Sequence, residues 1–165
     1  MKLVKLALFT TLAMALSWAE KFVLPVGFIP GFKIGLANII TIIVYKLFDV
    51  KSAYIVVFVR CILSSFLYGG ITSLPYSLFG GICALTVMYL IDKIPGVTYT
   101  CMAIAGAFFH NLAQVTVAVI IMNNFYIYSY MGILGIVSVV VGTFTGITAR
   151  LVVKQIKSGG MYYDK

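Results

Sequence analysis

The stretch Pro30-Gly31-Phe32-Lys33-Ile34-Gly35-Leu36-Ala37-Asn38 decides how this chain is organised, because it joins two long apolar runs. Pro30 and Gly31 interrupt the chain, Lys33 places one charge at the start of the second run, and Asn38 lies inside that run. A polar amide and a charge are costly within a membrane segment unless they face protein, water or a ligand. We therefore expect the chain to re-enter a membrane here and to form one wall of a binding site.

Composition assigns the chain to the polytopic membrane proteins. Of its 165 residues, 62% are hydrophobic and 10% are charged, whereas about a quarter of the residues in soluble domains are charged. Mean hydropathy is +1.11.

Six apolar runs, each long enough for a hydrocarbon core of about 30 Å, predict an all-α bundle of six transmembrane helices in one integral membrane domain, residues 1–165. The expected helices are about 3–19, 33–48, 53–70, 76–91, 99–122 and 131–153. The first run also resembles a secretory signal peptide, with its basic start and apolar centre.

Basic residues predict the orientation of the chain and argue against a nucleic-acid partner. They stand mostly between the apolar runs, which is the orientation signal of membrane proteins. Nine of the twelve fall on the side of the N-terminus, Lys21 and Lys33 fall on the other side, and Arg60 lies within the membrane. We expect a multi-pass protein with both termini in the cytoplasm.

Arg60 lies well inside the third run, with Ser64 and Tyr68 on the same helix face. An arginine in the middle of a membrane costs at least about 2.5–3.5 kcal/mol, so something must compensate its charge. Helix carbonyls or a structural partner would do so. An anionic group of a ligand is the alternative, because the chain has only four acidic residues.

The fifth run contains His110, Asn111 and Gln114 near its centre. A lone histidine is usually a structural residue, but three hydrogen-bonding side chains within five positions of a membrane helix favour a ligand-facing role. The chain has no phosphate-binding loop, no pair of carboxylates for acid–base chemistry or for magnesium, and no metal-ligand spacing among its three cysteines. We therefore expect a binding protein without enzymatic activity, metal or cofactor, energised by a partner.

Small residues recur on two of the expected helices. Ala7, Thr11, Ala15 and Ala19 are spaced by four residues, which lets another helix approach closely. That helix belongs either to this chain or to a separate membrane protein. The last run contains Gly142-x-x-x-Gly146, for which we expect packing within the bundle.

The motif at Pro30–Asn38 resembles the Gx transporter family, which is also labelled heptaprenyl diphosphate synthase component I. The resemblance continues through Arg60, Gly80-Gly81, Ala105-Gly106-Ala107-x-x-His110-Asn111-x-x-Gln114 and Gly142-x-x-x-Gly146 with Ala149-Arg150. That family is similar to the substrate-binding S components of energy-coupling factor (ECF) transporters. Such S components are six-helix proteins of the bacterial plasma membrane, in contact with membrane lipid. They capture a vitamin or similar scarce compound outside and dock on one transmembrane coupling protein and two ATPase subunits.

The resemblance implies a substrate site that faces outside, at helix ends and the loop between the first two helices. Its polar lining would comprise Lys33, Asn38, Arg60, His110, Asn111 and Gln114, and Tyr68 would cover a ring or isoprenoid portion. Ala15 and Ala19 would serve docking. The resemblance thus implies an importer component for a small, partly anionic vitamin- or isoprenoid-related compound. Two alternatives stay open. One is a non-catalytic membrane subunit for isoprenoid or quinone biosynthesis or for membrane electron transfer. The other is a structural scaffold whose polar residues pair with each other.

Overall fold

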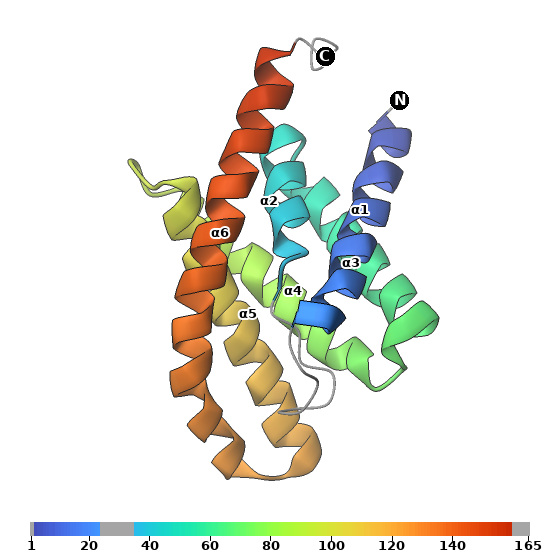
Figure 1. Cartoon of the computed structure of the whole chain (residues 1–165), viewed down its shortest axis with the longest axis vertical. Helices are drawn as coiled ribbons and strands as arrows, with labels where there is room; N and C mark the ends of the chain where they lie inside the picture. The colour runs from blue at the N-terminus through green and yellow to red at the C-terminus, as the bar shows by residue number, and fades with distance from the viewer. Residues whose placement is uncertain (1, 24–34, 160–165) are drawn as a thin grey trace.

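The computed structural model describes residues 2–23 and 35–159, and Figure 1 shows that these residues form a bundle of helices. No β-strand occurs in these two ranges, which confirms the all-α membrane fold. Five of the helices are long and apolar enough to span a membrane, and α2 is shorter. The elements are α1 (Lys2–Val23), α2 (Asn38–Leu47), α3 (Val50–Ser64), the π-helix η1 (Ser65–Gly69), α4 (Ser73–Asp92), α5 (Tyr99–Met122), the 3-10 helix η2 (Phe125–Tyr130) and α6 (Met131–Ser158).

Several helix boundaries differ from the expectation, among them the starts of α2, α3 and α4 and the ends of α1 and α6. α2 begins at Asn38 instead of Lys33, since Gly35 has φ +93°, a conformation that cannot continue a right-handed helix. α4 begins at Ser73, so Pro75 falls in its first turn, where a missing N–H costs no helical hydrogen bond. α1 continues past residue 19, where the expected helix ends, to Val23 and therefore includes Glu20.

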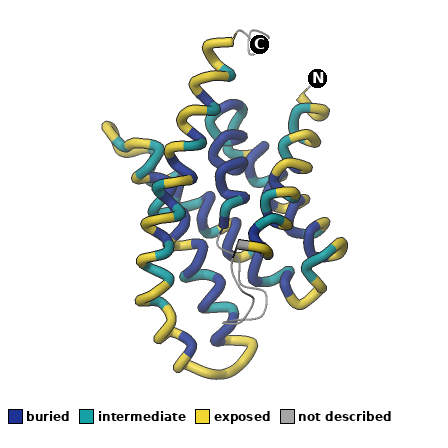
Figure 2. Tube along the Cα trace, viewed as in Figure 1, coloured by how far each residue is buried: buried dark blue, intermediate teal, exposed yellow. Residues whose placement is uncertain are grey.

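Helix α2 occupies the centre of the bundle and contacts all five of the other α-helices (Figure 1). Eight of its ten residues are buried, and Figure 2 shows it as an almost continuous buried segment. A helix that is apolar on all sides is stable only when it is surrounded in this way. At 1.5 Å per residue, α2 covers only about 15 Å, so its first residue lies deep inside the bundle.

Helix α1 has two different faces. Thr10, Ala13, Ser17 and Glu20 are buried against the bundle, at spacings of three, four and three residues. Three of the four small residues noted in the sequence, Ala7, Thr11 and Ala15, face outward, and Ala19 is half-buried. The small stripe is therefore not the surface by which α1 packs onto its own bundle.

Glycines let α4, α5 and α6 pack at very short range. A Cβ atom added to Gly142 would lie 2.4 Å from the Ile104 Cα, and one added to Gly146 would lie 2.6 Å from the Thr100 Cα. A Cβ on Gly106 would overlap the Met88 side chain. The Gly142-x-x-x-Gly146 motif therefore packs α6 against the backbone of α5, as expected from its spacing.

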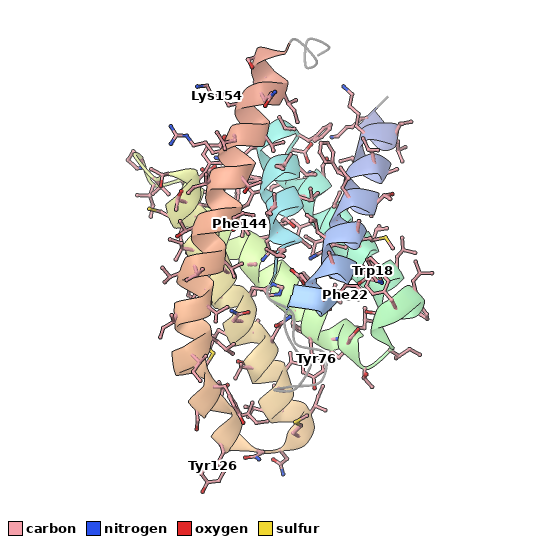
Figure 3. All side chains as sticks on the ribbon, in the orientation of Figure 1. Trp18, Phe22, Tyr76, Tyr126, Phe144 and Lys154 are labelled. Atoms are coloured by element: carbon pink, nitrogen blue, oxygen red, sulfur yellow. The ribbon has the colours of Figure 1, made fainter. Side chains whose placement is uncertain are left out.

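Charged groups gather at the end of the bundle where both chain termini lie (Figure 1). Lys2 donates to Asp49 at 2.8 Å, and Lys46 pairs with Asp92 while lying 5.2 Å from the centre of the Tyr99 ring. The hydrogen bonds from Lys2 and from the Ser52 N–H lower the pKa of Asp49 to about 2. Asp49 thus stays ionised at neutral pH and caps α3. Figure 3 shows Lys154 toward the same end and Tyr126 at the opposite one.

We expect Gly142→Ala and Gly146→Ala each to lower the unfolding temperature in detergent clearly, because the added methyl group meets backbone atoms that cannot move aside. Overpacking of this kind costs about 1–3 kcal/mol. Gly132→Ala is the matched control on the same helix, since no atom lies within 4 Å of its added Cβ. Equal melting temperatures for all three variants would contradict this packing.

Candidate functional site

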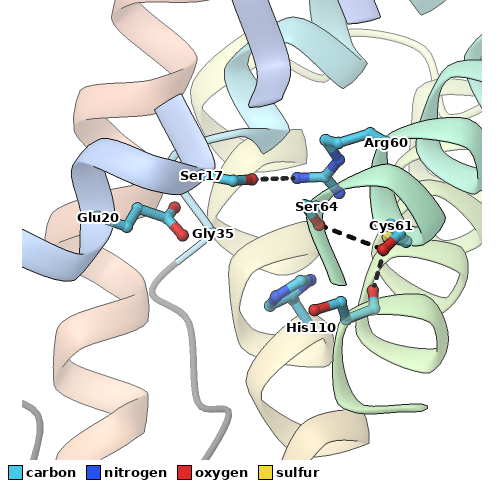
Figure 4. A pocket seen from close by; sticks show the side chains of 8 residues that line it. Ser17, Glu20, Gly35, Arg60, Cys61, Ser64 and His110 are labelled. Carbon is cyan, nitrogen blue, oxygen red and sulfur yellow. Dashed lines mark hydrogen bonds between the residues drawn. The ribbon is translucent and has the colours of Figure 1, made fainter. Parts of the chain in front are cut away.

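A cluster of buried polar side chains encloses a small cavity beside the start of α2 (Figure 4). Its walls come from α1, from the turn before α2, and from α3, α4 and α5. The centre of a water molecule can move within about 10 Å³ of this cavity, so the cavity has room for about one water. The lining residues are Ser17, Glu20, Gly35, Arg60, Cys61, Ser64, Ser77 and His110.

Arg60 is only 4% exposed, although its guanidinium is charged at every physiological pH. Its Nη1 donates to the Ser17 hydroxyl at 3.3 Å, which ties α3 to α1. Its Nε has no hydrogen-bond partner among the residues that the structure describes. Gly81 of α4 lies beside the guanidinium, since a Cβ there would lie 3.4 Å from Nη2 and 2.8 Å from the Val57 Cγ1. One donor of Arg60 thus remains available to a ligand.

Glu20 supplies the opposite charge and lies across the cavity from Arg60 (Figure 4). It is 5% exposed, and its Oε1 accepts the Ala37 N–H at 3.3 Å, directly before α2 begins. A carboxylate is favourable at the N-terminus of a helix because the helix dipole is positive there. Sequence reasoning missed Glu20 as a site residue. Its spacing from Ser17, Ala13 and Thr10 on one helix face was the signal that could have found it.

Asn38 is the first residue of α2 and is 2% exposed. Neither its Oδ1 nor its Nδ2 has a hydrogen-bond partner within residues 2–23 and 35–159. A Cβ added to Gly35 would lie 2.9 Å from this Nδ2 and 3.5 Å from the Cδ2 atom of His110, so the two side chains approach one another over Gly35. A buried amide with neither atom paired is costly in a protein interior. Within the described residues, the Asn38 amide therefore has the capacity to bind one further donor and one further acceptor.

His110 and Gln114 project from α5 toward α4. A hydrogen bond of 3.1 Å connects His110 Nε2 and Gln114 Nε2. A Cβ on Gly80 would lie 3.0 Å from the His110 ring and 3.1 Å from Gln114. A larger residue at this position of α4 would therefore displace the side chains of His110 and Gln114. Like Asn38 and Arg60, both side chains are buried.

The other residues that the sequence nominated lie elsewhere. Asn111 is fully buried and points at α6, where its Nδ2 donates to the Ser138 hydroxyl at 2.9 Å. Tyr68 lies in η1, is half-buried, and donates to the Met14 carbonyl of α1 at 2.8 Å. Neither residue lines the cavity, and of the nominated residues only Arg60 and His110 do; Asn38 and Gln114 lie beside it. Lys33 falls outside the described residues.

The chemistry of this cluster is that of binding. Arg60 and the serine hydroxyls donate, Glu20 accepts, and the Asn38 amide offers both functions. No group of three potential metal ligands occurs in the described parts of the chain. Asp49 and Asp92 are paired with lysines at the end where the termini lie, away from the cavity. Cys61 donates from its buried Sγ to the Ser77 carbonyl.

One family matches the sequence over most of its length. The family described as heptaprenyl diphosphate synthase component I matches residues 9–152, which cover all of the cavity-lining residues. No curated protein and no solved structure matches the chain. The matched region exceeds half of the chain, and the chain therefore belongs to the heptaprenyl diphosphate synthase component I family.

Proposed function

We propose that the protein is the substrate-binding S component of an ECF importer and that the cavity beside α2 is its ligand site. The observation that carries the proposal is that two buried groups at the cavity, the Asn38 amide and the Arg60 Nε, have no hydrogen-bond partner within residues 2–23 and 35–159. Within a membrane bundle such groups are expensive unless a ligand or water completes their hydrogen bonds. A structural scaffold would instead be expected to satisfy them within the protein.

Ligand binding requires the cavity to open. Small-molecule sites occupy several hundred cubic ångströms, whereas this cavity has room for about one water. Helix α1 is the wall most easily moved, because only 17% of its membrane span is buried, compared with 50% for α5. Its links near the cavity include single hydrogen bonds from Arg60 to Ser17, from Tyr68 to the Met14 carbonyl and from the Ala37 N–H to Glu20. We infer that α1 moves away from α3 when a ligand enters.

The outward face of α1 supports docking on a coupling protein. Ala7, Thr11 and Ala15 form a small-residue surface on the side of α1 opposite to Ser17 and Glu20. A transmembrane helix of another protein can approach such a surface closely. The same helix would then carry the docking surface on one face and part of the ligand site on the other. Docking, driven by two ATPase subunits, would therefore also affect how the site holds its ligand.

The orientation proposed for the protein places both termini in the cytoplasm of a bacterial cell. The positive-inside rule supports it, because the lysine-rich segments gather at the end of the bundle where the termini lie. The polar cavity then lies near the middle of the membrane, about 15 Å from the start of α3 at Val50, as measured along the helix to Arg60.

A second candidate is favoured by the description of the family, which names one component of a synthase. The chain would then be a non-catalytic membrane subunit of a prenyl diphosphate synthase. Both described aspartates are paired with lysines, so neither is arranged to bind magnesium and diphosphate. Native mass spectrometry of protein purified gently from its own membranes separates the candidates. A small ligand with a coupling protein and two ATPases supports the importer, whereas a soluble prenyltransferase without a ligand supports the synthase subunit.

Arg60→Gln is expected to weaken binding of the co-purifying small molecule by about 10- to 100-fold, the effect of losing a charge-assisted hydrogen bond worth about 1.5–3 kcal/mol. Arg150→Gln is the matched control, because Arg150 is exposed on α6. Isothermal titration in lipid nanodiscs gives the affinities, and melting curves confirm that both variants fold. Unchanged affinity in the Arg60 variant would show that Arg60 does not bind the ligand.

Asn111 and Gln114 are expected to respond differently to substitution. Asn111→Leu removes the bond to Ser138 and should lower the melting temperature while sparing affinity. Gln114→Leu removes the partner of His110 and should lower affinity. Both changes replace an amide by leucine on the same helix, so each serves as the control of the other. Equal losses of affinity would place Asn111 in the site as well.

Replacing both Ala15 and Ala19 by leucine is expected to abolish association with the coupling protein and to spare ligand binding, since bulk on the outward face of α1 blocks helix contact. Val140→Leu adds bulk at a position of α6 that is 65% exposed and serves as the control. Co-purification from membranes measures association. Retained association of the double variant would contradict docking through this surface.

A further inference from the structure

A groove runs along the outer surface of the bundle between α5 and α6, which lie side by side (Figure 1). Its lining residues fall within Cys101–Phe109 of α5 and Gly135–Val139 of α6, and we call it the α5–α6 groove. Its volume of about 430 Å³ lies in the range of small-molecule sites. The groove faces outward, because Phe108, Phe109 and Val139 along it are exposed.

The surface of the groove is apolar. A Cβ added to Gly135 would meet only the Phe108 ring, at 3.8 Å, so the glycine leaves the groove hollow at this point. The hydroxyl of Ser138 also lines the groove, but it already donates to the Leu134 carbonyl at 2.6 Å and accepts from Asn111 at 2.9 Å. The groove therefore suits a hydrocarbon chain better than a polar group.

A row of basic side chains continues the groove along α6. Arg150, Lys154 and Lys157 are all exposed in the C-terminal part of this helix. At 3.6 residues per turn, they lie within about 100° of Gly135 and Val139 around the helix axis. Apolar groove and basic residues thus occupy the same face of α6, with the basic residues at the end of the bundle where the chain termini lie (Figure 1).

The groove ends close to the first of these basic residues. Cys101, its last lining residue toward that end, lies in the first turn of α5. A Cβ added to Gly146 would lie 2.6 Å from the Cα of the adjacent Thr100, and Arg150 follows Gly146 by one helical turn, about 6 Å. A long basic side chain at this height extends to the headgroup region while the groove continues into the hydrocarbon region. Phospholipids place a charged phosphate and an acyl chain in the same order.

We propose that the α5–α6 groove binds an acyl chain of an anionic phospholipid and that Arg150 binds its headgroup. A guanidinium matches the geometry of a phosphate group, and basic residues at the membrane surface attract anionic lipids. The two described aspartates at this end, Asp49 and Asp92, are paired with lysines of α1 and α2 and not with the basic row of α6. The inference is separate from the importer proposal, because α6 supplies none of the residues that line the cavity beside α2.

Two lipids with the same acyl chains test the headgroup assignment: palmitoyl-oleoyl phosphatidylglycerol, which is anionic, and palmitoyl-oleoyl phosphatidylcholine, which is zwitterionic. Native mass spectrometry of the full chain, titrated with each lipid in micelles at pH 7, gives the affinities. The first molecule of phosphatidylglycerol should bind at least about tenfold more tightly, the usual effect of one charge-assisted hydrogen bond. Arg150→Gln should remove this difference. Lys51→Gln is the matched control, because it removes an exposed charge of α3 at the same end of the bundle.

Filling the groove tests the position of the acyl chain. Gly135→Leu should weaken binding of both lipids, since the added side chain occupies the hollow. Gly132→Leu is the same change on the same helix, with open space around the added Cβ, and should leave both affinities unchanged. Melting curves check that the variants fold. Dihexanoyl phosphatidylglycerol tests the groove in the unchanged protein, because it keeps the headgroup but lacks a long chain, and it should bind more weakly than the long-chain lipid.

Four outcomes would overturn the proposal: equal affinities for the two long-chain lipids, no bound lipid of either kind, an equal loss in the Lys51 and Arg150 variants, or equal binding of the short-chain lipid. An equal loss in the two variants would indicate general attraction to a basic surface. The affinity of the small molecule for the cavity beside α2 should not change in the Arg150 variant. Failure of the lipid assignment would therefore leave the importer proposal standing, and failure of the importer proposal would leave the lipid assignment standing.

Discussion

The polar start of α2 in the middle of the bundle is the constraint on which the rest of the structure depends. A helix leaves its first N–H groups without helical partners, and here that end lies about 15 Å from the charged turn that follows α2. Turn bonds from Asn38 N–H to the Gly35 carbonyl and from Ile39 N–H to the Leu36 carbonyl satisfy two of these groups, and Glu20 accepts the Ala37 N–H. A membrane interior offers no water to replace such bonds. The neighbouring helices must therefore bring polar side chains to this point.

With those side chains in place, the helices of the bundle are not all held equally tightly. α5 and α6 are held at backbone distance where Gly142 and Gly146 rest on α5, and Gly106 of α5 lies against the Met88 side chain of α4. Such packing leaves little freedom, because dense interiors respond to small volume changes. α1 is held less tightly, with 17% of its membrane span buried. An ion pair at its start, single hydrogen bonds along its length and the apolar packing of Phe9, Ala13 and Leu16 hold it to the bundle. The cavity lies where the lightly attached helix meets the tightly packed ones, which is a suitable place for a site that opens.

Membership in the heptaprenyl diphosphate synthase component I family and the chemistry of the cavity lead to different expectations. The family description names a component of a synthase, whereas we propose that the buried polar groups of this chain bind a ligand. The two described aspartates are engaged with lysines. Arg60 and Glu20, by contrast, converge on one cavity, and Asn38 lies beside it at the start of α2. The proposed importer role rests on that convergence and the outward small residues of α1.

The sequence by itself determined the all-helical membrane fold, because long apolar runs leave few other solutions in a bilayer. It also nominated Asn38, Arg60, His110 and Gln114, since polar groups in apolar runs stand out in any sequence. Only the tertiary structure decided that Glu20 joins them and that Asn111 turns to Ser138 instead. The reason is geometric: adjacent residues on a helix point about 100° apart, so His110 and Asn111 face different neighbours. Glu20 looked like the polar end of an apolar run, and only the position of the Ala37 N–H shows why α1 continues through it.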